Sequence, residues 1–309
     1  MLHLVLAAIL CRNLTSPFTG TICSPDDGKR HPAMVLLSGS EGGNSMRPFA
    51  RLFARHGYVA ASVAYFKMPG LPQTLVDVPV ETLAPAIKAL QARADVEPQR
   101  IGVLGGSKGG EFALLAASIY PQFKAVVAIV PSPMAYMGLG VNDVPDGCSW
   151  TLRGKPLPCI PPDPTAGMQI GMEFQQQQPV ALKPFYDASR EADPAQAKAA
   201  MFHLARIDGP VLCLGAMDDQ MWNSAAQCNI AAAYLRAHHH RYADRTIDYP
   251  DAGHLFYLAL HGPKSAIINY SIPGTRAAFA FGGTPQGDAD AAKSAWRTIW
   301  RFLGRALGS

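Results

Sequence analysis

The chain has 309 residues, of which 49% are hydrophobic and 16% are charged. This length and composition allow one large α/β domain with a sizeable core, and they argue against a second independent domain. The formal net charge of +4 is modest and is not gathered in a run, so the sequence carries no signature of nucleic-acid binding. No apolar run of about 18 residues or more occurs, which argues against a membrane span.

The N-terminal ten residues form an apolar stretch of signal-peptide size, but no basic segment precedes it. We expect residues 1–17 to be an N-terminal apolar segment that opens the fold as an extra strand, with a signal peptide as the alternative. Leu10 stands where lipidation of Cys11 would require a small residue, so a lipid anchor is not expected. The predicted compartment is the cytoplasm, with the periplasm or secretion as the alternative if the segment is a signal peptide.

An alternation of strands and helices follows, which predicts a mostly parallel sheet covered by helices on both faces. The residue before each helix and the turn residues between strands mark the boundaries. Pro79 suits the first turn of its helix, because the N–H that proline lacks is not needed there. The first predicted elements are strands at 18–23 and 31–38, a helix at 46–56, a strand at 58–65 and a helix at 79–94.

Near the middle of the chain, a short apolar strand leads into Gly105-Gly-Ser107-Lys-Gly109, and a helical pattern follows. This Gly-x-Ser-x-Gly arrangement predicts a nucleophile elbow, because a Cβ at Gly105 or Gly109 would collide with the neighbouring backbone. The elbow presents the Ser107 hydroxyl, and the amide of Lys108 points toward the oxygen of a bound carbonyl. The glycine-rich loop at 39–43 is expected to supply the second oxyanion-hole amide, from Ser40 or Glu41.

A serine nucleophile needs a general base and a group that orients the base. Asp218 and Asp219 follow a predicted strand that begins at Pro210, and His254 follows another predicted strand at 246–250. The chain order Ser, Asp, His is that of the α/β-hydrolases. Each candidate also stands beyond the end of a strand, where open parallel sheets place their reacting groups.

Residues 131–208 separate a buried strand at 124–130 from the strand that begins at Pro210. They are too many for a simple crossover and predict a cap inserted over the carboxyl edge of the sheet. We therefore expect residues 18–309 to form a single domain with this insertion. The residues expected to line the substrate pocket under the cap are Trp150, Leu157 and Phe174.

The six cysteines and one histidine run need separate interpretations. Cys148 and Cys159 bracket a predicted hairpin that a disulfide could staple, whereas Cys213 is predicted to be a small buried hydrophobic residue. No zinc-type spacing occurs, so a metal site is not expected.

The run 238–240 is interpreted as the polar end of a helix predicted at 224–235, with metal binding as the alternative. A last helix, at 291–307, should pack its apolar face on the sheet.

The chain resembles the dienelactone-hydrolase-like C-terminal domain shared by acyl-CoA thioester hydrolases and bile acid-CoA:amino acid N-acyltransferases. The resemblance runs from about Phe18 to the C-terminus and implies an α/β-hydrolase fold. It implies Ser107 as nucleophile, His254 as base and Asp219, the second aspartate of the pair, as acid, which leaves Asp218 to cap the following helix. The similar segments are Gly105-Gly-Ser-Lys-Gly-Gly-Glu111, Trp150-Thr-Leu-Arg-Gly-Lys-Pro-Leu-Pro158, Asp218-Asp-Gln-Met-Trp222, Tyr249-Pro-Asp-Ala-Gly-His254 and Phe281-Gly-Gly-Thr-Pro285.

This resemblance implies a serine hydrolase that cleaves acyl thioesters through an acyl-enzyme and needs no cofactor. The amino acid transferases of the family use cysteine, so a serine enzyme is expected to deliver its acyl group to water. The alternatives are a carboxylesterase or dienelactone-hydrolase-like enzyme for oxygen esters, and a non-catalytic binding protein. The expected partner is a small acyl thioester or ester, with no nucleic acid and no membrane span. The oligomeric state is left open.

Overall fold

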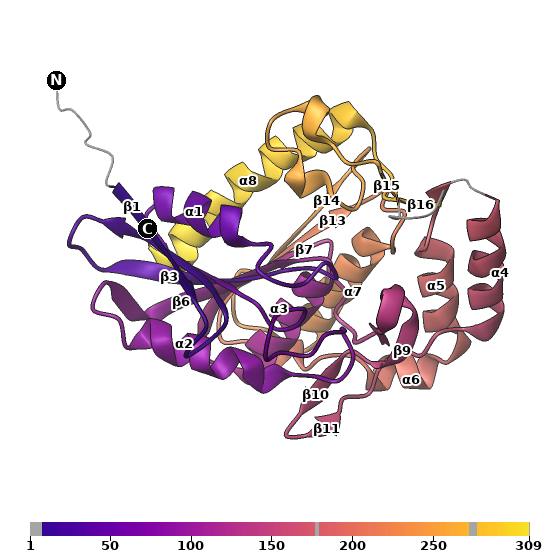
Figure 1. Cartoon of the computed structure of the whole chain (residues 1–309), viewed down its shortest axis with the longest axis horizontal. Helices are drawn as coiled ribbons and strands as arrows, with labels where there is room; N and C mark the ends of the chain where they lie inside the picture. Colours follow the sequence, from indigo (N-terminus) through magenta and orange to yellow (C-terminus); the bar gives the residue numbers. More distant parts are fainter. Residues whose placement is uncertain (1–7, 177–178, 272–276, 309) are drawn as a thin grey trace.

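The computed structural model describes residues 8–176, 179–271 and 277–308 (Figure 1). Its main sheet has eight strands, in which β2 is antiparallel to both of its neighbours and all other neighbours are parallel. The predicted mostly parallel sheet is therefore confirmed. In spatial order the strands are β1 (Ala8–Leu14), β2 (Gly20–Asp26), β4 (Val59–Val63), β3 (His31–Leu37), β6 (Val96–Gly106), β7 (Phe123–Ile129), β13 (Val211–Ala216) and β14 (Arg245–Tyr249).

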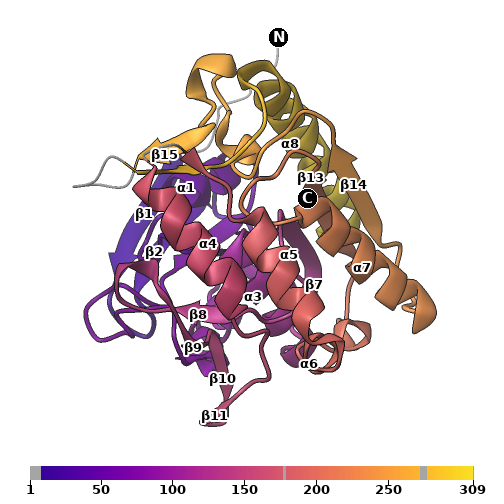
Figure 2. The same cartoon turned by 90° about the vertical axis from the view of Figure 1, so that its right-hand side faces the viewer.

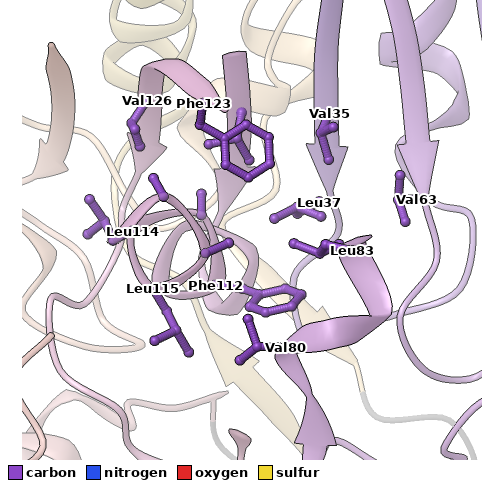
Figure 3. Close-up of a cluster of buried hydrophobic side chains, with 14 of the residues drawn as sticks. Val35, Leu37, Val63, Val80, Leu83, Phe112, Leu114, Leu115, Phe123 and Val126 are labelled. Atoms are coloured by element: carbon purple, nitrogen blue, oxygen red, sulfur yellow. The ribbon is translucent and has the colours of Figure 1, made fainter. Parts of the chain in front are cut away.

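Helices cover both faces of this sheet, as predicted (Figure 1). One face carries α2 (Ala84–Gln91), α3 (Lys108–Ile119) and α7 (Ser224–Ala237), and the other carries α1 (Arg47–Arg55) and α8 (Pro285–Leu307). In β3, Val35 and Leu37 belong to the cluster that contains Phe112 of α3 (Figure 3), while Met34 and Leu36 belong to the cluster under α1 and α8. A strand buried on both faces has no polar alternation, which explains why the central strands are continuous apolar runs.

Two predicted helix starts are wrong. The helix expected from Pro79 begins at Ala84, because Val78 and Pro79 form the short strand β5 (Val78–Pro79), which pairs in parallel with β10 (Trp150–Leu152). A 3-10 turn, Val80–Leu83, then leads into α2. The last helix starts at Pro285, six residues before its predicted start, since the Thr284 side chain caps it by accepting from the Gly287 amide.

The segment between β7 and β13 lies on the side of the sheet where the parallel strands end (Figures 1 and 2). Its helices α4 and α5 pack on each other and lie in front of α3 in the view of Figure 2. This segment comprises β8 (Met137–Leu139), β9 (Pro145–Cys148), β10, β11 (Lys155–Pro156), α4 (Pro164–Gln175), β12 (Pro179–Val180), α5 (Lys183–Ala192) and α6 (Pro194–Ala199). Two further short strands, β15 (Asn269–Ser271) and β16 (Ala278–Ala280), form a small sheet with β12.

All six cysteines are paired in disulfides. Cys148 and Cys159, whose pairing the sequence left open, are bonded to each other. Cys213 is buried, as predicted, but it is also bonded to Cys228, which was not predicted, and this bond ties β13 to α7. The third disulfide, Cys11–Cys23, joins β1 to β2. Residues 1–7, on which the signal-peptide alternative depends, lie outside the described residues, and among those described no helix is long and apolar enough to cross a membrane.

The disulfides predict a simple result in a thiol assay. Alkylation of the denatured, unreduced protein is expected to add no label, and alkylation after reduction should add six labels, as mass spectrometry can count. Each bond closes a loop of 11 to 15 residues. Loss of one bond should therefore lower the free energy of unfolding by about 2–3 kcal/mol. Labelling of unreduced protein would contradict the pairing.

Candidate active site

The turn between β6 and α3 has the geometry of a nucleophile elbow. Ser107 connects the two elements with φ 55° and ψ −127°, a backbone conformation that is strained for a residue with a Cβ. A Cβ at Gly105 would collide with the carbonyl group of Gly109, and one at Gly109 would collide with the carbonyl oxygens of Leu37 and Ser38. The predicted reason for both glycines is thus confirmed, and the tight turn leaves the Ser107 side chain half-exposed.

Ser107, His254 and Asp219, which were predicted to act together, lie in one hydrogen-bonded chain. The Ser107 hydroxyl lies 2.8 Å from His254 Nε2, and His254 Nδ1 lies 2.9 Å and 3.0 Å from the two Asp219 oxygens. A neutral imidazole can donate from Nδ1 to the carboxylate while Nε2 accepts from the hydroxyl. The Asp219 and His254 side chains are buried, at 1% and 3% exposure, so water does not compete for these contacts.

The two neighbouring aspartates have different partners. Asp219 faces His254 and also accepts from the amides of Met221 and Trp222, at 2.9 Å and 3.2 Å. Asp218 instead accepts from the Gly283 amide at 2.8 Å. The predicted role of Asp218 as helix cap is wrong.

The cap of α7 is Asn223, whose side chain accepts from the Ala226 amide. Asp218 is unsuited to this role because its carboxylate turns toward Gly283 and the Gln220 side chain. The bond to the turn that contains Gly283 therefore holds Asp218 away from His254, and Asp219 is the aspartate that contacts the histidine.

The late turn at residues 281–284 holds the acid loop and the histidine loop together. The carbonyl of Phe281 accepts from the amides of His254, at 2.8 Å, and Gln220, at 3.3 Å. Gly282 and Gly283 both have positive φ, and a Cβ on Gly282 would collide with the Asp218 carbonyl. No role was predicted for this turn from the sequence. The signal that could have found it is the pair of glycines directly before a helix cap, which indicates a close approach of two backbones.

Asp288, in the first turn of α8, is hydrogen-bonded to the loop that carries His254. Its Oδ1 accepts from the amide of Gly253, the residue before His254, at 2.8 Å. The side chain is fully buried, and Oδ2 has no partner among the described residues. Burial, with a smaller contribution from the nearby Asp218 carboxylate, raises the pKa of Asp288 to about 6.

Replacing Asp288 with asparagine should change how stability depends on pH. A carboxyl whose pKa rises on folding stabilises the folded state in its protonated form, and this contribution is lost as pH rises through about 6. An asparagine side chain does not titrate, so D288N should gain about 1–3 kcal/mol relative to the native protein between pH 4 and pH 7. Urea unfolding at the two pH values measures this difference. Exposed Asp290 provides the control, since D290N should show no such gain.

The two predicted sources of oxyanion-hole amides lie beside Ser107. Lys108 is the first residue of α3, and its amide has no acceptor among the described residues. A Cβ on Gly39 would lie 3.4 Å from the Ser107 Cβ, so the glycine-rich loop lies against Ser107. The amides of Ser40 and Glu41 likewise have no backbone acceptor in the described chain, whereas the Gly39 amide donates to the Glu41 carboxylate at 3.1 Å.

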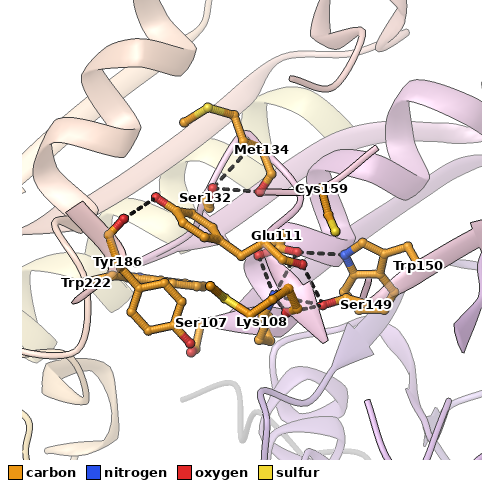
Figure 4. Close-up of polar contacts among 12 residues, drawn as sticks. Ser107, Lys108, Glu111, Ser132, Met134, Ser149, Trp150, Cys159, Tyr186 and Trp222 are labelled. Atoms are coloured by element: carbon orange, nitrogen blue, oxygen red, sulfur yellow. Dashed lines mark hydrogen bonds and ion pairs between the residues drawn. The ribbon is translucent and has the colours of Figure 1, made fainter. Parts of the chain in front are cut away.

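The Lys108 side chain points away from the reacting hydroxyl and into a buried polar cluster (Figure 4). Its ammonium group contacts Glu111 at 3.1 Å, Ser149 Oγ at 2.9 Å and the Met137 carbonyl at 3.3 Å. Glu111 also accepts from the indole of Trp150 at 2.7 Å. Burial lowers the pKa of Lys108 and raises that of Glu111, so each depends on the other to stay charged. The contacts join the segment between β7 and β13 to the helix that begins at the nucleophile.

The prediction that Trp150 lines a substrate pocket is wrong. Its side chain is fully buried, its indole nitrogen is bonded to Glu111, and its ring stacks on Phe112 at 4.3 Å. Leu157 is half-buried and packs against the same hydrophobic core. Among the described residues, no contact brings either side chain to Ser107 or His254.

Other aromatic side chains lie close to His254. The rings of Trp222 and Phe281 lie 5.8 Å and 6.1 Å from its imidazole, measured between ring centroids. Phe174, a predicted lining residue on α4, meets Phe279 edge to face at 5.4 Å. Among the described residues, no ring contact brings Phe174 or Phe279 to His254, so Trp222 and Phe281, neither of which was predicted to line the site, are the aromatic residues found beside it.

Removing the charge of Lys108 should destabilise the fold. In K108M the Glu111 carboxylate stays buried without a cation, and the free energy of unfolding should fall by about 3–5 kcal/mol. The control is R93M, because Arg93 and Asp95 form an ion pair that is about one-third exposed. That pair should contribute at most about 1 kcal/mol. Equal losses in the two variants, measured by chemical denaturation, would contradict a dependence on burial.

The histidine run at the end of α7 has structural partners. The ring of His238 stacks on Tyr234 at 3.9 Å, and its Nδ1 lies 2.8 Å from the Tyr234 carbonyl. His240 lies between the Asp244 carboxylate and the Ile207 carbonyl. In the described parts of the chain, no group of three or more His, Cys, Asp or Glu side chains could hold a metal ion.

Comparison with known protein families gives one match. Residues 78–309 match the family described as BAAT / acyl-CoA thioester hydrolase C terminal. Among similar proteins, acyl-coenzyme A thioesterase 6 of Mus musculus is 27% identical over 294 residues, which cover 93% of this chain and 62% of that protein. Acyl-coenzyme A thioesterase 1 of Rattus norvegicus is 27% identical over 93% of this chain and 63% of its own length. The chain thus spans less than two-thirds of these relatives.

Two solved structures illustrate the similarity in fold. A dienelactone hydrolase-like promiscuous phosphotriesterase from metagenomic libraries superposes with a TM-score of 0.58 at 14% identity, covering 97% of this chain and 99% of that one. An esterase of Pyrobaculum calidifontis gives a TM-score of 0.55 at 16% identity, over 97% and 86% of the two chains. At such low identity these likenesses show the α/β-hydrolase fold alone.

Proposed function

This chain belongs to the BAAT / acyl-CoA thioester hydrolase C-terminal family, and on that premise we propose that it is a serine hydrolase that cleaves acyl thioesters. The observation that carries the proposal is the buried hydrogen-bonded chain from Ser107 through His254 to Asp219. A serine hydroxyl attacks a carbonyl carbon at neutral pH only when a positioned base removes its proton. Here His254 is the base, and Asp219 is the acid that orients it.

In the acylation step, His254 Nε2 takes the proton of Ser107 as its oxygen attacks the thioester carbonyl carbon. The amides of Lys108 and of the 39–43 loop stabilise the oxyanion, and the buried Asp219 carboxylate stabilises the imidazolium. When the tetrahedral intermediate collapses, the carbon–sulfur bond breaks and the sulfur leaves as a thiol with the proton from His254. The products are a free thiol and a serine ester.

In the deacylation step, water replaces the thiol beside His254. The imidazole takes a proton from this water as its oxygen attacks the ester carbonyl, and then returns the proton to the Ser107 oxygen as it leaves. The acyl group departs as a carboxylic acid, and the enzyme returns to its starting state. Every proton transfer in the cycle uses Nε2, while Nδ1 keeps its bond to Asp219.

The family and the named relatives support a thioester rather than an oxygen ester as the preferred substrate. We also propose that the segment between β7 and β13 acts as the cap, because it lies beyond the ends of the parallel strands that carry the site. Phe281, whose ring lies beside the imidazole of His254, is the proposed contact for the acyl group. A small acyl thioester or ester is the proposed partner.

The three disulfides provide an indication of the cellular compartment in which the protein works. Such bonds form and persist where the surroundings are oxidising, and they are rare in the cytosol. We therefore propose the periplasm or the exterior of the cell as the working compartment, which was the alternative to the cytoplasm in the sequence analysis. Labelling of thiols before cell lysis tests this, since all six cysteines should already be oxidised.

The test of the proposed function is a matched set of substrates. Purified protein is assayed with acyl-CoAs of increasing chain length and with p-nitrophenyl esters of the same acyl groups, with S107A as the blank. We expect a higher kcat/KM for the thioesters. Turnover of the oxygen esters alone would replace the proposal with a carboxylesterase, and no turnover of either series would favour a binding protein.

A further inference from the structure

A concave surface, which we call the basic groove, lies at the end of the sheet opposite Ser107. It encloses about 730 Å³. Lys124 is near the start of β7, Arg245 begins β14, and Arg301 and Arg305 are near the C-terminal end of α8. In Figure 1 the C-terminal end of α8 lies on the side away from α4 and α5. The charged side chains that line the basic groove are Lys124, Asp208, Arg241, Arg245, Arg301 and Arg305.

The basic groove is separate from the hydrolytic site because it lies where the strands begin. Ser107, Asp219 and His254 follow the carboxyl ends of β6, β13 and β14, whereas Lys124 and Arg245 lie at the amino ends of β7 and β14. A strand of five to seven residues separates the two ends by about 20 Å. A substrate held at Ser107 therefore does not explain the cationic residues of the groove.

The basic groove holds a concentrated positive charge. Its five cationic side chains and single carboxylate give a formal charge of +4, which equals the net charge of the whole 309-residue chain. The carboxylate, Asp208, is already paired with Lys124 at 2.5 Å and Arg241 at 2.6 Å. Its hydrogen bond with Lys124, followed by that with the Tyr242 hydroxyl, holds the pKa of Asp208 well below its usual range, so it stays ionised.

Three arginines of the basic groove have no carboxylate to balance them. Among the described residues, no ion pair involves Arg245, Arg301 or Arg305, and all three are exposed. Arg301 and Arg305 are four residues apart on α8 and so lie on the same side of the helix. Like charges at this spacing repel, and an anion bound between them would relieve the repulsion.

We propose that the basic groove binds a small polyanion that carries two or more phosphate groups. Guanidinium groups match phosphate oxygens in pairs, so arginine suits this chemistry better than lysine does. The concave shape and the volume are those of a small-molecule site. The walls also include Phe302 and the Tyr242 ring, which can contact an uncharged part of the ligand. This site goes beyond the proposed hydrolase function and does not depend on it.

The test is a calorimetric titration with inorganic tripolyphosphate at constant ionic strength. The native protein is expected to bind one tripolyphosphate saturably, and the double variant R301Q/R305Q should bind it at least about tenfold more weakly. The matched control is K293Q/R297Q, which removes two exposed charges with the same spacing from the same helix but outside the groove. It should bind as the native protein does.

Four results would overturn the proposal. Equal weakening in both double variants would mean that only the net charge matters, and absence of saturation in the native protein would mean that no small-molecule site exists. Saturable binding only of long RNA or of anionic phosphatidylserine vesicles would assign the groove to a macromolecular surface. S107A should bind tripolyphosphate as the native protein does, so this test remains valid even if the hydrolase proposal fails. Loss of binding in S107A would mean that the anion binds at the hydrolytic site and not in the basic groove.

Discussion

Replacing Ser107 with alanine is expected to lower kcat/KM for an acyl thioester by about three to six orders of magnitude. The variant loses the oxygen that lies 2.8 Å from His254 Nε2, and with it the acyl-enzyme. The fold should be unaffected, because alanine keeps the Cβ and the same backbone conformation. Steady-state kinetics and a stopped-flow search for the thiol burst measure the loss, and thermal unfolding checks the fold.

The matched control for this prediction is S118A. Ser118 is on the same helix, at the end far from the site, and its hydroxyl is bonded to the Leu115 carbonyl. We expect S118A to keep native activity. If S107A retained more than about a hundredth of the native kcat/KM, the nucleophile would have to be another group and the proposed mechanism would be wrong.

Asparagine at position 219 should be far more damaging than asparagine at position 218. In D219N the side chain no longer carries the charge that stabilises the imidazolium, and its NH₂ group favours the wrong histidine tautomer. The expected loss in kcat is about 10³- to 10⁴-fold. Asp218 does not touch His254; it accepts from the Gly283 amide and the Gln220 side chain. D218N should therefore keep kcat within about tenfold of native, because the single amide oxygen of asparagine still accepts one of these two bonds and the bond that is lost does not involve His254.

The two asparagine variants control for each other, because each removes one carboxylate charge from the same loop. Besides kcat, the pH profile separates them, since the acidic limb of D219N should shift and that of D218N should not. Equal activity in the two variants would contradict the assignment of Asp219. A greater loss in D218N would place the acid on the neighbouring residue.

Much of the fold was predictable because it depends on local patterns. The apolar runs at β3, β7 and β13 predicted buried parallel strands, since only a strand covered on both faces lacks polar alternation. The predicted start of α2 failed for a tertiary reason. Val78 and Pro79 pair with Trp150 and Thr151, which lie far along the chain, and this pairing overrides the preference of proline for a helical first turn.

The contacts of buried polar side chains were not predictable. Lys108 and Glu111 are three residues apart, a spacing that also occurs on exposed helix faces, and only the docking of Ser149 and Trp150 makes the pair buried. Because Trp150 is buried in this contact, it does not line the pocket that was predicted for it. In the same way, Cys213 pairs with Cys228 because α7 packs on β13, and no spacing in the sequence indicates that.

The sequence by itself determined the fold class, the elbow at Ser107 and the positions of the acid and the base, because each follows from a short segment at the end of a strand. The family resemblance pointed to Asp219 rather than Asp218 as the partner of His254, but the physical reason lies in the tertiary structure, since the partner of Asp218 is Gly283 on a turn that follows much later. Only the tertiary structure decided where the net charge lies. Five cations from separate parts of the chain converge at one end of the sheet. Unlike the residues of the predicted site, these cations stand in no recognisable motif, so their meeting in space has no signature along the sequence.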